Sequence, residues 1–278
     1  MSRRAGTCIA ATLALLGGLL IAQPADTSAS RLSLDAILMR LQIHRWEYAR
    51  NVPDFFADEY VTSELRGLRT APINAITESI FRLRRDSEPG VYPPDLVETR
   101  TVRRSNGVTT MAGSPIAGPA MLINAFSNGL STITLAQKTC YDFTLSRHRD
   151  VRHISVFAID YRLRPGAETT GYCLPWRNVT GQAIVEAQTL NILHFDMQVP
   201  RYPVAPGIVG PWRWSIDYAP VVFDGISFSM PRRIESVSES LDGRFLWTFI
   251  ANYRNYHKTT VHSRIITSTS SDGTTPPR

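Results

Sequence analysis

The residue types that carry chemistry in enzymes are present in this chain of 278 residues, but not in catalytic spacings. The nearest match to the G-x-S-x-G turn of a nucleophilic serine, Asp224-Gly-Ile-Ser-Phe, lacks the second glycine, and its Ser227 falls on an expected strand. The sequence has neither the H-E-x-x-H pair of zinc enzymes nor a glycine-rich phosphate loop after a strand. We therefore expect no catalytic residue and no cofactor.

The histidines and carboxylates form no metal-ligand pattern either. Two histidine pairs lie five residues apart on expected strands, and this spacing places their side chains on opposite faces of a sheet. Asp160 and Glu186 are candidate acids by type, but the sequence assigns neither of them a partner. We expect no metal site, and an exported hydrolase built from scattered groups is the weakest functional hypothesis. The histidines are His44, His148, His153, His194, His257 and His262.

The N-terminus predicts export. Arg3 and Arg4 precede an apolar stretch that is too short for a membrane span and is followed by small residues, as in a secretory signal peptide. We predict a signal peptide over residues 1–30 and a periplasmic or secreted protein. In that compartment Cys140 and Cys173 are expected to form a disulfide. The loop that it closes is worth about 3–4 kcal/mol on the chain-entropy model.

The formal net charge is +6, spread along the chain in small arginine clusters. Such a surface favours solubility and non-specific contact with anionic partners. An anionic envelope surface is therefore one candidate partner, whereas export argues against nucleic acid. We expect a monomer.

Alternation of apolar and polar residues predicts that sheet strands dominate. Between residues 181 and 230, apolar side chains return at every second position, as in strands with one buried and one solvated face. The Asn106-Gly107, Asp224-Gly225 and Asp242-Gly243 pairs predict tight turns. The four prolines and two glycines within residues 200–211 predict a loop over 201–211. The expected strands are 55–65, 76–84, 96–104, 133–135, 140–145, 154–162, 181–185, 192–199, 212–218, 221–223, 226–230, 234–240, 245–253 and 261–266.

Two short helices are expected beside these strands. The first covers residues 33–48, with Ser33 as N-cap and Asp35 in the first turn. The second opens at Pro119 and stops at Asn128-Gly129. We therefore predict a mainly β (α+β) fold, a curved antiparallel sheet forming a half-barrel covered by two short helices. It forms a single domain over residues 31–266, with a disordered tail at 267–278.

Aromatic side chains gather on the apolar faces of the expected strands. They either fill a core, because aromatic rings bury large areas wherever they are placed, or line a cavity for an apolar ligand. The candidate ligand-binding residues are Phe157, Phe195, Trp214, Tyr218, Phe228, Trp247 and Phe249.

Short motifs in the second half of the chain resemble a family of uncharacterised exported bacterial proteins. They are Gly181-Gln-Ala-Ile-Val-Glu186, Thr189-Leu190-Asn-Ile-Leu193, Ile216-Asp217-Tyr218-Ala219, Phe228-x-x-Pro231 and Tyr253-Arg-Asn-Tyr256. That family is similar to the LolA/LolB-like lipoprotein carriers. The resemblance covers roughly residues 140–266 and implies a half-barrel around an apolar cavity, with no catalytic residue to carry over. His194 departs from the pattern, since an arginine or lysine is usual there.

Three functions are compatible with the sequence. The first is a non-enzymatic carrier or binding protein for an apolar ligand, a lipid or the acyl chain of a lipidated protein. The second is a structural or interaction module whose half-barrel is filled by its own side chains, and the third is the exported hydrolase. The first two differ in whether the concave face of the sheet is empty or filled.

Overall fold

The computed structural model describes residues 32–86, 95–111, 113–116, 118–120, 125–151 and 154–259, all within one compact unit that starts at Leu32. The predicted signal peptide (1–30), the predicted tail (267–278) and the expected strand at 261–266 lie outside these residues. Within the described ranges, no helix combines the length and hydropathy that a membrane crossing requires.

Eleven strands form one antiparallel sheet in the order β4-β3-β2-β1-β11-β10-β9-β8-β7-β6-β5. Since β4 and β5 are its two ends, the sheet is open, and the predicted mainly β fold is confirmed. The pairing of β1 with β11 joins two runs of consecutive antiparallel strands, β1–β4 and β5–β11. The strands are β1 (Phe55–Gly67), β2 (Ile73–Asp86), β3 (Asp95–Ser105), β4 (Val108–Thr109), β5 (Tyr141–Val151), β6 (Ile154–Leu163), β7 (Thr180–Glu186), β8 (Ile192–Ala205), β9 (Ile208–Phe223), β10 (Ile226–Glu239) and β11 (Phe245–Lys258).

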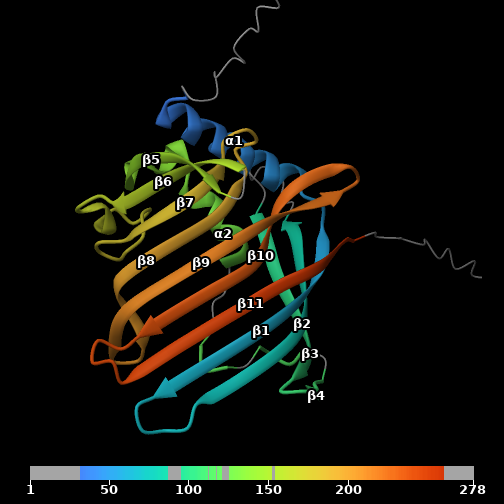
Figure 1. Cartoon of the computed structure of the whole chain (residues 1–278). Coiled ribbons are helices and arrows are strands. Elements are labelled where there is room, and N and C mark those ends of the chain that lie inside the picture. Colours follow the sequence, from blue (N-terminus) through green and yellow to red (C-terminus); the bar gives the residue numbers. More distant parts are fainter. Residues whose placement is uncertain are drawn as a thin grey trace, which may run out of the picture. The chain divides into compact units, whose positions relative to one another are not determined.

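The register follows from the alternation in the sequence. Phe195 of β8 lies opposite Ile216 of β9, and Met197 lies opposite Trp214, so their apolar side chains share one face. A slip of one residue would turn each of these side chains to solvent, which is why the buried face fixes the pairing. This buried face is the concave face of the sheet, and Figure 1 shows the sheet curving around α2.

Two helices cover the concave face and one end of the half-barrel (Figure 1). Helix α1 (Leu34–Asn51) begins where predicted, because the Ser33 hydroxyl accepts a hydrogen bond from the Ala36 amide at 3.2 Å. It buries Ile37, Leu38 and Leu41 in the core. Helix α2 (Ala125–Thr132) continues past the predicted stop, and its predicted start at Pro119 is wrong, because Pro119 and Ala120 are not helical.

Gly129 therefore acts through packing and not as a helix cap. A Cβ at this position would lie 2.2 Å from the Tyr218 hydroxyl oxygen and 2.7 Å from a methyl carbon of Ile216. Only glycine lets α2 approach β9 this closely. The expected strand at 133–135 is also wrong, because the chain after α2 enters a 3-10 helix, η2 (Leu135–Thr139).

The expected loop over 201–211 is wrong as well. β8 extends to Ala205, β9 starts at Ile208, and the two form a hairpin with Gly207 in the left-handed region at φ 73°. The prolines are tolerated because the register shifts on both sides of the Tyr202–Gly210 and Pro203–Val209 pairs. Prolines fit strands at such bulges, where a ladder hydrogen bond is already missing.

Candidate functional site

All seven aromatic residues predicted to bind a ligand lie in the core, and none is more than 8% exposed. They come from β6, β8, β9, β10 and β11. Several of their rings contact other aromatic rings, as in the Phe195–Trp214 pair, with centroids 5.1 Å apart, and the Tyr161–Phe195 stack at 5.9 Å. Whether any of them contacts a ligand stays a prediction.

Side chains of the chain itself fill the described part of the concave face. Phe126 of α2 stacks on Phe81 with centroids 4.5 Å apart and meets Tyr253 edge-on at 5.0 Å. Phe55 packs against both phenylalanines. α2 thus occupies the place where a ligand would lie in an empty half-barrel.

A buried charged cluster, which the sequence analysis missed, lies on the same face in β1–β3. The Glu59 carboxylate is fully buried and accepts hydrogen bonds from the Ser79 hydroxyl at 2.6 Å and the Tyr253 hydroxyl at 2.8 Å. The Arg100 guanidinium donates to both of its oxygens, at 2.9 and 3.1 Å, and also pairs with Glu98. Burial tends to lower the pKa of Arg100, but these anionic neighbours raise it overall.

One signal in the sequence points to this cluster. Glu59 stands in phase with the apolar residues Phe55, Ala57 and Val61 of β1, so its carboxylate must face the core. A buried carboxylate needs a cation or several donors. The structure supplies both, so the cluster is satisfied and has a structural role.

Three buried polar atoms have no hydrogen-bond partner within the described part of the chain. They are the indole nitrogen of Trp214, the hydroxyl of Tyr218 and the hydroxyl of Thr77. Burial raises the pKa of Tyr218, so its hydroxyl stays protonated at neutral pH. Trp214 and Tyr218 lie four residues apart on the buried face of β9.

A cleft of about 300 Å³ opens where α1 meets the end of the sheet. Its apolar wall combines side chains from α1, from α2 and from the β7–β8 and β9–β10 hairpins. Of the seven predicted ligand residues, Phe228 lines the cleft, and its ring meets that of Tyr48 edge-on at 6.3 Å. The apolar wall is formed by Leu41, Tyr48, Leu130, Leu190, Ile192, Ile226 and Phe228.

The polar rim of the cleft comes mainly from α1. His44, Arg45 and Glu47 line it, and Arg45 is half-buried. Burial lowers the pKa of Arg45, although an arginine keeps its charge at neutral pH. No described residue forms an ion pair or hydrogen bond with its guanidinium. An apolar wall beside an unpaired cation suits an amphipathic ligand with an anionic end.

The opposite, convex face carries a polar groove of about 620 Å³ over β5–β8. Asp142, Asp160 and Asp196 line it, and burial raises the pKa of Asp196. Asp160 accepts a hydrogen bond from the Gln182 amide at 2.6 Å, and no group of three metal-ligating side chains is found among the described residues. The groove is therefore a polar surface lined by carboxylates, and electrostatic repulsion from Asp160 adds to the rise in the pKa of Asp196.

His194 and Glu186 are likewise held by neighbours. The His194 ring nitrogen Nδ1 lies 2.7 Å from a carboxylate oxygen of Asp217, its cross-strand partner on β9. Glu186 accepts a hydrogen bond from the Thr189 hydroxyl in the β7–β8 turn. Neither group faces the cleft.

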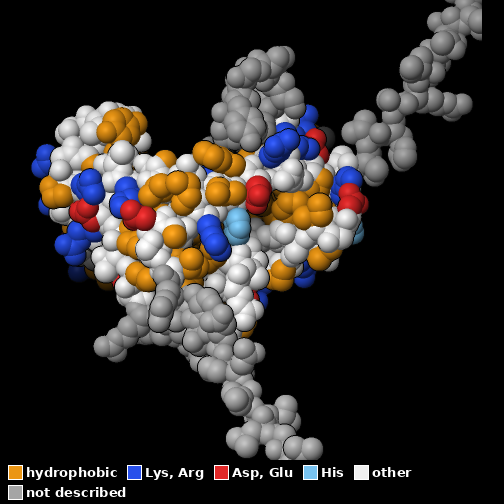
Figure 2. Space-filling model, turned by 90° about the horizontal axis from the view of Figure 1, so that it is seen from above, with side chains coloured by type: hydrophobic (Ala, Val, Ile, Leu, Met, Phe, Trp, Pro, Cys, Tyr) orange, Lys and Arg blue, Asp and Glu red, His pale blue; other side chains and the backbone are white. Residues whose placement is uncertain are grey.

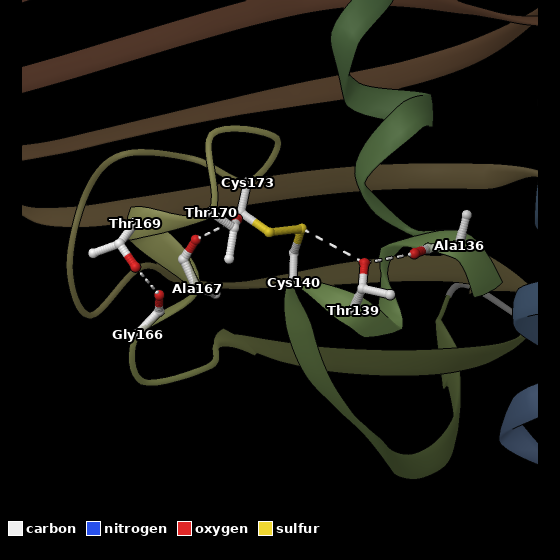
Figure 3. Close-up of a disulfide and its surroundings, with 8 residues drawn as sticks. All are labelled: Ala136, Thr139, Cys140, Gly166, Ala167, Thr169, Thr170 and Cys173. Atoms are coloured by element: carbon white, nitrogen blue, oxygen red, sulfur yellow. Dashed lines mark hydrogen bonds between the residues drawn. A yellow bond between two sulfur atoms is a disulfide. The ribbon is translucent and has the colours of Figure 1, made fainter.

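The predicted disulfide between Cys140 and Cys173 is present, with the Cα atoms 5.5 Å apart (Figure 3). It ties the start of β5 to the loop between β6 and β7. Cys140 is buried, and its carbonyl accepts a hydrogen bond from the Arg164 amide at 2.9 Å. The bond stabilises the outer strands of the sheet and takes no part in the cleft.

No family model matches the sequence, and no curated protein does. Among solved structures, the chain is similar to a LolA superfamily protein from Nitrosomonas europaea, with a TM-score of 0.33 and 12% identity over 83% of this chain and 96% of that one. It is also similar to a DUF1329 family protein from Desulfovibrio piger (TM-score 0.35, 12% identity, 81% and 92%).

A third similar structure is a putative outer membrane lipoprotein-sorting protein domain from Vibrio parahaemolyticus (TM-score 0.35, 8% identity, 81% and 93%). These neighbours include the LolA group that the sequence motifs resemble. TM-scores below 0.5 are too low to support a functional argument for this chain, so its function has to be argued from the cleft.

Proposed function

We propose that this protein is a non-enzymatic binding or carrier protein of the cell envelope that holds an acyl chain in the cleft between α1 and the β9–β10 hairpin. The observation that carries the proposal is the cleft itself, a concave site with an apolar wall in a face that is otherwise filled. Its volume of about 300 Å³ lies at the lower end of the range for small-molecule sites. A cleft of this volume suits a single acyl chain or the end of a longer one.

Arg45 supports a ligand with an anionic end. A half-buried guanidinium without a partner gains a charge-assisted hydrogen bond when a carboxylate or phosphate binds beside it. The same cleft would therefore bind a fatty acid more tightly than the corresponding fatty alcohol. Arg45→Gln should reduce the affinity for the acid and leave that for the alcohol unchanged.

A fluorescent fatty acid tests the proposal with a matched pair of variants. Ile226 and Val222 are both exposed on the β9–β10 hairpin, at 57% and 64%, but only Ile226 lines the cleft. Ile226→Asp should weaken probe binding by at least about tenfold, because it removes the apolar contact of one side chain and places a carboxylate against the acyl chain of the probe. Val222→Asp should leave binding unchanged. Equal loss in both variants, or no binding to the native chain, would refute the proposal.

The filled concave face favours a second candidate, a structural or interaction module. Six of the seven predicted ligand residues lie outside the cleft. Under this alternative the cleft binds no acyl chain, and native mass spectrometry of the purified protein finds no co-purifying lipid. A bound species with the mass of a lipid contradicts it.

A further inference from the structure

The outer side of α1 carries an exposed apolar stripe. Met39, Ile43 and Trp46 are 43%, 41% and 39% exposed, and their i, i+4, i+7 spacing places them on one side of the helix. A helix on a protein surface normally presents polar residues to water and apolar ones to the core. Since α1 also buries an apolar side in the core, it is apolar on two sides.

The stripe runs beside the mouth of the cleft. His44, Arg45 and Glu47 alternate with the stripe along α1 and line the cleft, and the exposed Ile226 belongs to its far wall. Figure 2 looks onto this end of the unit and shows hydrophobic side chains gathered across the middle of the face, with basic and acidic side chains and a histidine among them. The apolar stripe and part of the cleft wall therefore belong to the same helix.

Cations flank the stripe. Arg40 and Arg50 are exposed, and no described residue forms an ion pair with either. Arg85 adds a third cation, because its guanidinium donates a hydrogen bond to the carbonyl of Arg50. Of the two acids on α1, Asp35 is neutralised by Lys138 at 2.8 Å, which leaves Glu47. The face combines exposed apolar side chains with a net positive charge.

We propose that this face, defined by Met39, Ile43, Trp46, Arg40 and Arg50, docks on an anionic lipid bilayer. Helices with apolar side chains beside arginines bind in the interfacial plane of membranes, and tryptophan favours the headgroup region. Docking in this way places α1, which also lines the cleft, against the lipids. The inference goes beyond the proposed function, because docking needs no ligand in the cleft and involves residues that do not bind one.

A second copy of this chain is a poorer occupant. A two-fold dimer through this face would bring Arg40, Arg50 and Arg85 against the same residues of the other copy, because such an interface pairs one patch with itself. A bilayer containing anionic lipids neutralises these cations instead.

Vesicle flotation tests the proposal on residues 31–278. This segment holds the complete described core, from Ile37 to Tyr253, and omits the apolar stretch at residues 9–22, which would itself bind membranes. The probes are vesicles of phosphatidylcholine alone and of phosphatidylcholine with one part in three of phosphatidylglycerol. The test variant is Ile43→Ser with Trp46→Ser.

Its matched control is Leu68→Ser with Leu241→Ser, which removes two exposed side chains from the β1–β2 and β10–β11 turns. Both turns lie at the other end of the sheet from α1 (Figure 1).

We expect the native segment to float with the anionic vesicles and not with the neutral ones, and to be released by salt. The test variant should bind about tenfold more weakly. The exposed parts of Ile43 and Trp46 together amount to roughly the apolar area of one whole side chain, and the variant can no longer bury this area in the lipid. The control should bind as the native segment does. Absence of flotation, equal binding to both vesicles, equal loss in variant and control, or a dimer cross-linked through α1 would overturn the proposal.

Quenching by brominated lipids provides a second measurement that needs no destabilising change. Trp46 is the tryptophan of α1 and is 39% exposed, so the fluorescence of the native segment should fall when it binds brominated anionic vesicles. Trp46→Phe should abolish most of this quenching. Quenching that survives the substitution would place the contact elsewhere. The Ile226→Asp test of the cleft is unaffected by either outcome, so the two proposals fail separately.

Discussion

Deleting one hydroxyl from each of two buried tyrosines on the concave face should change the stability of the protein in opposite directions. Tyr218 and Tyr253 are 7% and 4% exposed, and burial raises the pKa of both, so both are neutral at pH 7. Tyr218→Phe and Tyr253→Phe therefore delete the same neutral group. The two sites differ in what the hydroxyl contacts.

The Tyr253 hydroxyl donates to the Glu59 carboxylate at 2.8 Å. A hydrogen bond to a charged group contributes about 1.5–3 kcal/mol, so Tyr253→Phe should lower the free energy of unfolding by that amount. In a domain of this size, the loss corresponds to a fall of roughly 3–12 °C in Tm. The Tyr218 hydroxyl has no partner among the described residues, and a buried unsatisfied donor costs about 1–3 kcal/mol. Tyr218→Phe should therefore raise the stability by about 1 kcal/mol or more.

Urea unfolding, followed by tryptophan fluorescence, measures both changes against the native chain. The slope of the transition should stay constant, because neither substitution alters the surface exposed on unfolding. A destabilising Tyr218→Phe would show that this hydroxyl has a partner in solution. A neutral Tyr253→Phe would show that Glu59 does not need its third donor. Either result refutes the reasoning.

Three further predictions concern the sheet and its turns. Replacing Cys140 and Cys173 by serine should lower the free energy of unfolding by about 3–4 kcal/mol, read from the urea midpoint, and should leave fatty acid binding intact. Glu59→Gln should cost about 3–5 kcal/mol, because it leaves the buried Arg100 without its main partner, and an unchanged Tm would contradict this. Hydrogen bonds from a serine hydroxyl and a backbone amide in its turn lower the pKa of Asp242 to about 2. The stabilisation of the β10–β11 turn is then complete above pH 4 and lost as the pH falls through 2, and an NMR titration of Asp242 with a midpoint near 4 would disprove it.

The local parts of the fold could be predicted from the sequence. Alternation along residues 192–199 and 212–218 identifies the buried face, because a pleated strand sends neighbouring side chains to opposite sides. The Asp224-Gly225 pair likewise predicts a tight turn, because these residue types tolerate positive φ. In the structure both residues adopt it, at 50° and 82°. The disulfide follows from an even pair of cysteines in a chain that is predicted to be exported.

The non-local parts could not be predicted in this way. Nothing in β1 or β11 marks them as partners, since they are far apart in the sequence and pair only when the two runs of strands, β1–β4 and β5–β11, join in one sheet. The proline-rich hairpin at 201–211 contradicts local propensity, because packing and register shifts overrule it. Gly129 carries a helix-stop signal that a close contact with Tyr218 explains instead.

No single segment of the sequence indicates the cleft. Its wall comes from α1, α2 and the β7–β8 and β9–β10 hairpins. In the sequence alone, nothing distinguishes Arg45 from any other charged residue on a helix. The aromatic alternation predicted the core correctly as a buried face, but it could not distinguish a cavity wall from a packed interior. Only Phe228 belongs to both the predicted set and the cleft.

Photo-crosslinking tests the central claim, that the cleft holds an acyl chain, most directly. A fatty acid with a diazirine at the end of its chain is bound to the native protein, irradiated, and located by peptide mass spectrometry. We expect labels on residues 190–192 and 226–229 and on Leu41 or Leu130, all of them competed away by unlabelled fatty acid. Labels spread over the convex face, or unaffected by the competitor, would contradict it.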